Sequence, residues 1–426
     1  MDASALSRRG FIVALSTFAG QAMATELLRP TDGGDDTRLV QDAIDSAPDG
    51  VVQLGAGTFR VDALSIRRPV MIAGVAGQTV LRSREGSILD IEADDVSLAG
   101  LTFLSPSVAG SLVAAARCER LHVESCRFTG GERGLWLDTC GGRVEGNHFN
   151  KQSQTGIFSQ DGTGLVIAEN TVDEIGNNGI QVWRREPGED GTQIIANRVK
   201  GIAAESGGTG QNGNGIVVFR AGNVIVANNR VSDCVFSAIR NNSGSNIIIT
   251  GNSISRTTEV AIFVEFAYQG AVVSNNVIED VAYGICITNF DYDGRLTVCN
   301  GNVIRRVVGA TKPIDSPAIG IHAEADTIIS NNILDDVKDV GIRLGWGGIN
   351  RNLSAVGNTL RNCGVGIAPS VVEGSGNMMV ANNTFSDSKK AAVQGFKYME
   401  AGTGDLLAPG ADVPAHITLS DNSVRP

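Results

Sequence analysis

A short phrase that recurs through residues 146–385 constrains the fold of this chain more than any other feature. The phrase is Asn, any residue, then an apolar residue, and successive copies start 23 to 32 residues apart. Recurrence at a period of roughly 20–50 residues is typical of repeat proteins, whose units pack only on their neighbours. The ten copies start at Asn147, Asn170, Asn197, Asn229, Asn252, Asn276, Asn302, Asn332, Asn358 and Asn383.

The residues between these copies indicate strands and not helices. Apolar positions alternate, as in Gly179-Ile180-Gln181-Val182, and the units are rich in Val and Ile. A period of two is that of a strand. Two dozen residues accommodate three short strands, and successive coils then stack at roughly 4.8 Å. We therefore predict an all-β, single-stranded parallel β-helix whose Asn residues form a buried amide ladder and not a binding site.

Composition and charge exclude several classes of partner. The net charge is −11 and no basic stripe is present, so we expect neither nucleic acid nor an anionic membrane as a partner. None of the seven Cys has metal-ligand spacing, and no zinc or other metal site is predicted among them. We interpret them as small buried hydrophobes, with a disulfide among Cys118, Cys126 and Cys140 as the alternative.

The N-terminus resembles an export signal. Ser7-Arg8-Arg9-Gly10-Phe11-Ile12 is similar to the twin-arginine motif, and Ala22-Met23-Ala24 resembles a cleavage site. The resemblance implies the twin-arginine export machinery as a partner and a periplasmic or secreted location. No later run is long and apolar enough to span a bilayer, so no membrane association is expected after processing.

The chain divides into three expected segments. Residues 1–24 are the signal peptide, 25–50 a linker and capping helix, and 51–426 the β-helix. Residues 35–46 have an amphipathic pattern, and Asp36 is the expected N-cap. A β-helix exposes an apolar end with unpaired edges, and we expect this helix to cover it.

The strands that begin Gly-Ile or Ala-Ile carry the candidate site. The residue after Ile and the residue two further on point outward, and like positions stack from coil to coil. Aromatic rings and guanidinium groups on such a column suit a chain of acidic sugars, because rings stack and guanidinium pairs with uronate carboxylates. The candidate catalytic residues are Arg240, Glu265, His322, Glu324 and Arg343, and the candidate substrate-binding residues are Trp183, Arg220, Phe263 and Trp346.

Two pairs in these columns suggest chemistry. His322 and Arg343 share a column one coil apart, which suits a base and a cation in a lyase. Glu265 and Glu324 share a column two coils apart, roughly 10 Å, which is near the separation of an inverting hydrolase pair. The alternatives are an idle surface His, salt-bridged arginines and a coincidental Glu pair.

The surrounding loops add two expectations. Insertions at 200–214 and 305–318 leave from the same corner, and we expect them to wall a groove. Asp291 and Asp293 are candidate Ca²⁺ ligands beside Glu265, with a plain acidic loop as the alternative.

The whole pattern resembles a known superfamily. The helix, the phrase Leu54-Gly55-Ala56-Gly57-Thr58-Phe59 and the Asn and Gly-Ile coils are similar to pectate-lyase-like right-handed parallel β-helix proteins. With the twin-arginine start, the chain most resembles the twin-arginine-translocated repetitive proteins of alphaproteobacteria. The resemblance implies a right-handed coil and action on acidic polysaccharides.

The catalytic motifs of these relatives are not reproduced. Tyr283-Gly284-Ile285 is followed by Cys286, where the epimerase pattern has an acid, a Pro and a His. Two hypotheses therefore stand. The first is an exported polysaccharide lyase or hydrolase that binds and modifies an acidic polysaccharide in the groove. The second is a non-catalytic glycan-binding or envelope-structural β-helix.

Overall fold

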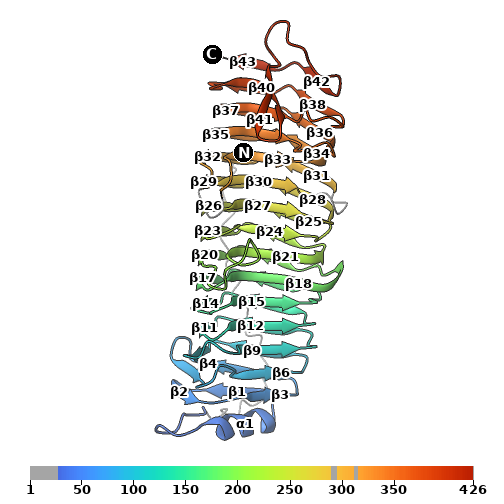
Figure 1. Ribbon diagram of the computed structural model, residues 1–426. Helices are drawn as coiled ribbons and strands as arrows, with labels where there is room; N and C mark the ends of the chain where they lie inside the picture. The colour runs from blue at the N-terminus through green and yellow to red at the C-terminus, as the bar shows by residue number, and fades with distance from the viewer. Residues whose placement is uncertain (1–26, 289–294, 311–314, 426) are drawn as a thin grey trace, which may run out of the picture.

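The chain winds into one long column of stacked coils, as the repeat predicts (Figure 1). The computed structural model describes residues 27–288, 295–310 and 315–425. The proposed signal peptide and the candidate Ca²⁺ ligands Asp291 and Asp293 lie outside these ranges. Each coil contributes one strand to each of three faces, and neighbouring coils pair in parallel register. The fold is a parallel β-helix.

The first face is a continuous sheet. Its strands are β1 (Val51–Leu54), β4 (Val70–Gly74), β7 (Val96–Ala99), β10 (Leu121–Glu124), β13 (Gly142–Glu145), β16 (Val166–Ala168), β19 (Gln193–Ile195), β22 (Ile225–Ala227), β25 (Ile247–Thr250), β28 (Gln269–Ser274), β31 (Arg295–Asn300), β34 (Ala325–Ser330), β36 (Arg351–Val356), β38 (Met378–Ala381) and β42 (Ile417–Ser420).

The second face carries the residues that follow the recurring Asn. Its strands are β2 (Gly57–Arg60), β5 (Thr79–Arg82), β8 (Thr102–Ser105), β11 (Arg127–Gly130), β14 (His148–Asn150), β17 (Thr171–Ile175), β20 (Arg198–Ile202), β23 (Arg230–Cys234), β26 (Ser253–Thr257), β29 (Val277–Val281), β32 (Val303–Val307), β35 (Ile333–Leu344), β37 (Thr359–Pro369), β39 (Thr384–Ser386) and β43 (Ser423–Arg425).

The third face carries the Gly-Ile strands, and β35 and β37 continue onto it. Its other strands are β3 (Leu64–Ile66), β6 (Leu89–Ile91), β9 (Ser111–Ala116), β12 (Arg133–Asp138), β15 (Thr155–Gln160), β18 (Asn178–Glu189), β21 (Asn214–Gly222), β24 (Ile239–Asn242), β27 (Val260–Glu265), β30 (Tyr283–Thr288), β33 (Ile319–Ala323) and β40 (Ala391–Lys397), with β41 (Glu400–Asp405) antiparallel to β40.

The Asn residues form the predicted amide ladder at the corner between the first and second faces. In a typical rung, the backbone N–H and the side-chain amide of Asn252 both donate to Oδ1 of Asn276, at 2.9 and 3.0 Å. The ladder extends one rung beyond the recurring phrase, to Asn422. Buried amides are costly unless bonded, so each rung depends on the next coil lying directly above it. The residue before each rung makes the left-handed bend, as at Gly251 (φ 68°) and Asn275 (φ 56°).

The interior of the column is a set of apolar stacks. The residues two positions after each ladder Asn, from Phe149 to Phe385, are fully buried. Phe103, Phe128 and Phe149 stack with ring centroids 4.9 and 4.4 Å apart. All seven cysteines are buried and unbridged, and the thiols of Cys118 and Cys140 lie 3.0 Å apart on adjacent coils.

A helix covers the N-terminal end, as expected (Figure 1). Helix α1 (Thr37–Ser46) buries Val40 and Ile44 against the first coil. Asp36 is at the N-cap position, as expected, but its side chain makes no capping hydrogen bond. Its carboxylate instead accepts hydrogen bonds from Thr31 and from the backbone N–H of Arg60. Asp36 therefore ties the linker to the first coil.

Candidate functional site

The outward positions of the third face stack in the two predicted columns. The first column pairs Gln181 with Val217, Val217 with Arg240, and Arg240 with Phe263. The second column lies two residues further along each strand and contains Trp183, Phe219, Asn242 and Glu265 in successive coils. These registers bring residues about two dozen positions apart into contact.

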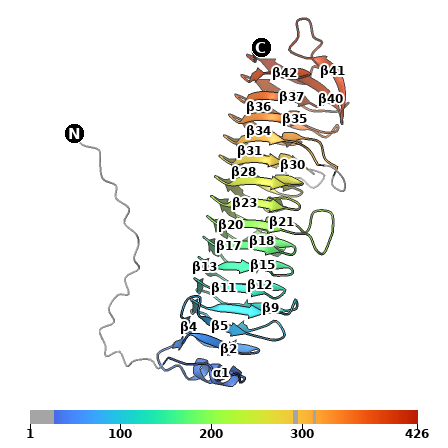
Figure 2. The same cartoon turned by 90° about the vertical axis from the view of Figure 1, so that its left-hand side faces the viewer.

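A pocket of about 270 Å³ opens over these columns beside the loop 203–213. That loop joins β20 to β21 and projects from the side of the column next to the β21 label (Figure 2). One wall is aromatic, since the Trp183 ring lies 5.4 Å from Phe219 and 5.3 Å from Phe158. The lining residues are Trp183, Thr209, Gly210, Gln211, Asn214, Val217, Phe219, Arg240 and Asn242.

Arg240 joins the loop to the sheet at one end of the pocket. Its Nε donates to Oε1 of Glu265 at 2.6 Å, and its Nη2 lies 2.6 Å from the same oxygen. Its Nη1 donates to the carbonyl of Gly210, and its guanidinium lies 5.1 Å from the centre of the Phe263 ring. Glu265 is 1 % exposed. A buried carboxylate needs a cation and hydrogen bonds, and Arg240 supplies both.

The loop itself is held by a second, shorter row of amides. Asn178 accepts hydrogen bonds from the backbone and side-chain amides of Asn214, at 3.0 and 3.2 Å. Asn178 also donates to the carbonyl of Gln211, and Asn214 donates to that of Gly210. Because the loop backbone is bonded at several points, the pocket wall is pre-formed.

A separate cluster lies further along the same face, on β30, β33 and β35, under the hairpin of β40 and β41. The Tyr283 hydroxyl and Nδ1 of His322 are 2.9 Å apart. The Arg343 guanidinium lies between two rings, 5.5 Å from the centre of Trp346 and 5.0 Å from that of Phe396. His322 and Arg343 are only 6 % and 1 % exposed. Apolar packing and stacked rings therefore enclose both groups.

Burial sets the protonation of this cluster. Desolvation, aided by the neighbouring Arg343 charge, lowers the pKa of His322 to about 3. Desolvation also lowers the pKa of Arg343 to about 10, although the nearby Tyr283 opposes this shift. Burial raises the pKa of Tyr283 well above its ordinary value. At neutral pH the imidazole is uncharged, the phenol keeps its proton and the guanidinium remains charged.

The structure thus divides the predicted site residues into two groups. Arg240 and Trp183 line the pocket, Glu265 and Phe263 support Arg240, and Arg220 stacks on Phe219 with 4.8 Å from guanidinium to ring centre. His322, Arg343 and Trp346 belong to the enclosed cluster.

One continuous open groove was expected, and the structure differs for a physical reason. The C-terminal hairpin brings Phe396 onto Arg343, so this part of the outward column becomes a packed layer. Glu324 follows β33 and is half-buried, with its backbone N–H bonded to the carbonyl of Ile287. Thr288 lies opposite Glu265 on the next coil, but the pairing of β30 with β33 ends at Ala323, one residue before Glu324. The expected separation of Glu265 from Glu324 therefore stays a prediction.

Sequence reasoning placed two pocket residues in the outward columns without assigning them a role. Phe219 extends the aromatic wall, and Asn242 donates to Oε1 of Glu265 at 3.4 Å. The loop residues Thr209, Gly210 and Gln211 were expected only as part of a wall. The Gly-rich composition of this insertion was the available signal.

The family comparison agrees with the architecture. Residues 90–199 and 188–303 match the family described as the right-handed beta helix region, and together they span half of the chain. The protein belongs to the right-handed β-helix family. No curated protein matches the sequence.

Solved structures with TM-scores of at least 0.50 share the fold of this β-helix at low sequence identity. The N-terminal fragment of bacteriophage phi29 gene product 12 has a TM-score of 0.52 at 15 % identity, covering 91 % of this chain and 71 % of that one. The enzymatically active domain of bacteriophage CBA120 tailspike protein 2 has a TM-score of 0.50 at 14 % identity, and the match covers 66 % of this chain and 48 % of that one. The catalytic unit of an α-1,3-glucanase from Streptomyces thermodiastaticus has a TM-score of 0.49 at 17 % identity, and the match covers 96 % of this chain and 70 % of that one.

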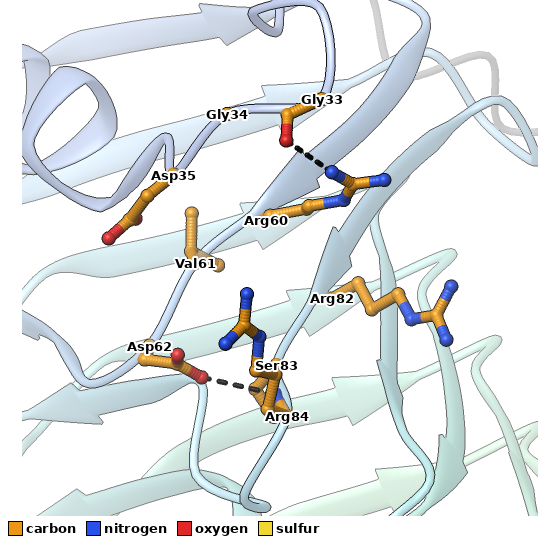
Figure 3. Close-up of a pocket in the computed structure, with 9 residues that line it drawn as sticks. All are labelled: Gly33, Gly34, Asp35, Arg60, Val61, Asp62, Arg82, Ser83 and Arg84. Carbon is orange, nitrogen blue, oxygen red and sulfur yellow. Dashed lines mark hydrogen bonds between the residues drawn. The ribbon is translucent and has the colours of Figure 1, made fainter.

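The β-helix also has a cavity of about 390 Å³ at its N-terminal end (Figure 3). Arg60, Arg82 and Arg84 share it with Asp35 and Asp62. Arg60 donates to the carbonyl of Gly33, and the backbone N–H of Arg84 donates to Asp62 at 3.1 Å. These contacts hold the linker and first coils together, and the two carboxylates offset two of the three guanidinium charges, which favours a structural role. In the described part of the chain, no helix combines the length and apolar character needed to cross a bilayer.

Proposed function

We propose that this protein is exported and binds an acidic polysaccharide in the pocket between the third face and loop 203–213. A sugar ring stacks on Trp183 and Phe219, and its carboxylate meets the guanidinium of Arg240. The observation that carries the proposal is this juxtaposition of an aromatic wall and a cation in one pre-formed pocket.

Arg240 is suited to this role although it already pairs with Glu265. The described contacts use three of its five N–H donors, on Glu265 and Gly210, and its side chain keeps 14 % of its surface exposed. The buried pair fixes the plane of the guanidinium, so little conformational entropy is lost when a carboxylate binds.

We favour a pocket that binds the polysaccharide without catalysing its cleavage. The described lining residues include no carboxylate, His or Tyr, and the carboxylate of Glu265 lies buried behind Arg240. His322, the predicted base, is enclosed in the C-terminal cluster. A lyase or hydrolase acting on the same polymer is the alternative, with Glu324 as a half-buried carboxylate further along the face.

Binding to polygalacturonate and alginate fragments, measured by calorimetry, tests the proposal. We expect Trp183→Ala to weaken binding about tenfold, or ~1.4 kcal/mol. The matched control is Trp136→Ala, because Trp136 lies on the same face outside the pocket lining. Methyl-esterified polygalacturonate, which lacks the charge, should bind more weakly than the free acid.

Two results would overturn the proposal. Equal affinity of the wild type and the Trp183→Ala variant would remove the pocket from recognition. New reducing ends or unsaturated uronate ends in the same mixtures, lost with Glu324→Gln, would establish the catalytic alternative.

A further inference from the structure

A second group of polar side chains lies on the first face, away from the pocket. His122 and Glu124 alternate on β10, so their side chains share one side of the strand. Glu145 is on β13, labelled in Figure 2, and is paired in register with Glu124. The parallel register thus places two carboxylates directly opposite each other, with an imidazole beside them. Like charges in directly opposed positions destabilise a sheet, and Arg143 offsets only the charge of Glu145 through a direct ion pair.

The three ligand atoms converge. Nε2 of His122 lies 3.1 Å from Oε1 of Glu145 and 3.8 Å from Oε2 of Glu124. One ligand atom from each residue lies within 4.8 Å of the other two. Bonds of roughly 2.0–2.2 Å from nitrogen and oxygen to a zinc ion need separations near these values, and small side-chain rotations supply the remainder.

Arg143 orients one of these carboxylates. Its Nε and Nη2 both donate to Oε2 of Glu145, at 3.0 and 2.7 Å. The other oxygen, Oε1, is thereby turned toward His122. A hydrogen bond to the outer oxygen of a ligating carboxylate is a common supporting contact in metal sites.

The adjacent coils leave room above the three side chains. Ala99 pairs with Glu124 on one side, and Ala168 pairs with Glu145 on the other. Methyl side chains at these positions do not cover the carboxylates, and the three ligand side chains remain 30–44 % exposed. A bound ion can therefore keep a position open to water or to an external ligand.

We propose that His122, Glu124 and Glu145 form a binding site for a divalent transition-metal ion of the zinc class. An imidazole nitrogen with two carboxylate oxygens suits zinc or cobalt better than calcium or magnesium, which take oxygen ligands. The site is independent of the polysaccharide pocket, because it lies on a different face and shares no residue with it.

Titration calorimetry of the purified protein with ZnCl₂ tests the site. We expect one saturable site per chain, weakened at least tenfold by His122→Ala and by the double change Glu124→Gln with Glu145→Gln. With CoCl₂ in place of zinc, we expect visible absorption bands of bound cobalt that are lost in the same variants. Because the altered side chains are partly exposed, circular dichroism should show an unchanged fold.

A second His–carboxylate pair provides the matched control. Nε2 of His148 lies 3.2 Å from Oδ1 of Asp173, with side chains 29 % and 16 % exposed, and in the described chain no third ligand joins them. His148→Ala should leave zinc affinity and the cobalt spectrum unchanged. Absence of saturable binding, or equal loss in the His148 and His122 variants, would overturn the proposal.

Discussion

Arg240 and Glu265 form a buried ion pair across adjacent coils, with Nε and Nη2 of the arginine each 2.6 Å from one carboxylate oxygen. The same guanidinium holds the loop at Gly210, so one side chain links the sheet, the carboxylate and the pocket wall. Such a pair specifies geometry more than it adds stability, since both groups lose water to form it.

Breaking this pair should be costly. We expect Arg240→Ala to lower the free energy of unfolding by about 3 kcal/mol, because Glu265 is left buried without its cation. The control is Arg256→Ala, which removes a partner from Asp233 with side chains 57 % and 45 % exposed and should cost less than about 1 kcal/mol. Calorimetric unfolding of both variants measures the difference, and equal losses would contradict the interpretation.

The loop should depend on glycine at position 210. Gly210 has φ +123°, and an added Cβ would lie 2.3 Å from Nη1 of Arg240. Gly210→Ala should therefore displace the loop and weaken binding of acidic oligosaccharides. Gly207, in the same loop, has φ +66° with nothing within 4 Å of an added Cβ, so Gly207→Ala should cost backbone strain alone. Comparable affinities for the two variants would show that the contact with Arg240 does not position the wall.

A rung of the Asn ladder should matter most in the middle of the column. Asn252→Ala removes the acceptor for both donors of Asn229 and one of the donors to the carbonyl of Val226. We expect a loss of roughly 3 kcal/mol in unfolding free energy. Asn422→Ala, at the partly exposed last rung, should cost less. Thermal unfolding followed by circular dichroism gives both values, and the opposite order would argue against the ladder as a source of stability.

His322 should make stability fall in acid. Its pKa is about 3 in the folded protein and 6.5 ordinarily, so between these values the unfolded chain binds a proton that the folded protein does not. The contribution of His322 to the free energy of unfolding is fully present above pH 6.5. It decreases toward pH 3, by up to ~1.4 kcal/mol per pH unit. His322→Gln removes this titration. The melting temperature of the wild type minus that of the variant should therefore decrease from pH 7 to pH 4, and a constant difference would be inconsistent with a buried neutral imidazole.

The repeated residues could be interpreted from the sequence because their environment is local and recurs. The Asn phrase and the Gly-Ile strands predicted the ladder and the two outward columns, including the pairing of His322 with Arg343. Exposure could not be predicted in the same way. Arg343 and His322 are in outward positions, yet Phe396, more than fifty residues later, helps to enclose them.

The candidate sites show the same division between local pattern and distant packing. The spacing of coils determined that Trp183, Phe219 and Asn242 would share a column, but the contact of Gly210 with Arg240 depends on how an inserted loop folds back. The sequence analysis did not predict the cluster of His122, Glu124 and Glu145. The two glutamates are paired at a spacing of 21 residues, and both precede the first copy of the recurring Asn phrase.

The sequence by itself determined that the chain coils, which residues face inward and which positions stack, because periodic burial of apolar side chains leaves few alternatives. Only the tertiary structure decided which outward residues stay in water, which pair across coils and where a pocket opens. Those outcomes depend on loops and a terminal hairpin that follow no period, and on the desolvation of charges by residues distant in the chain.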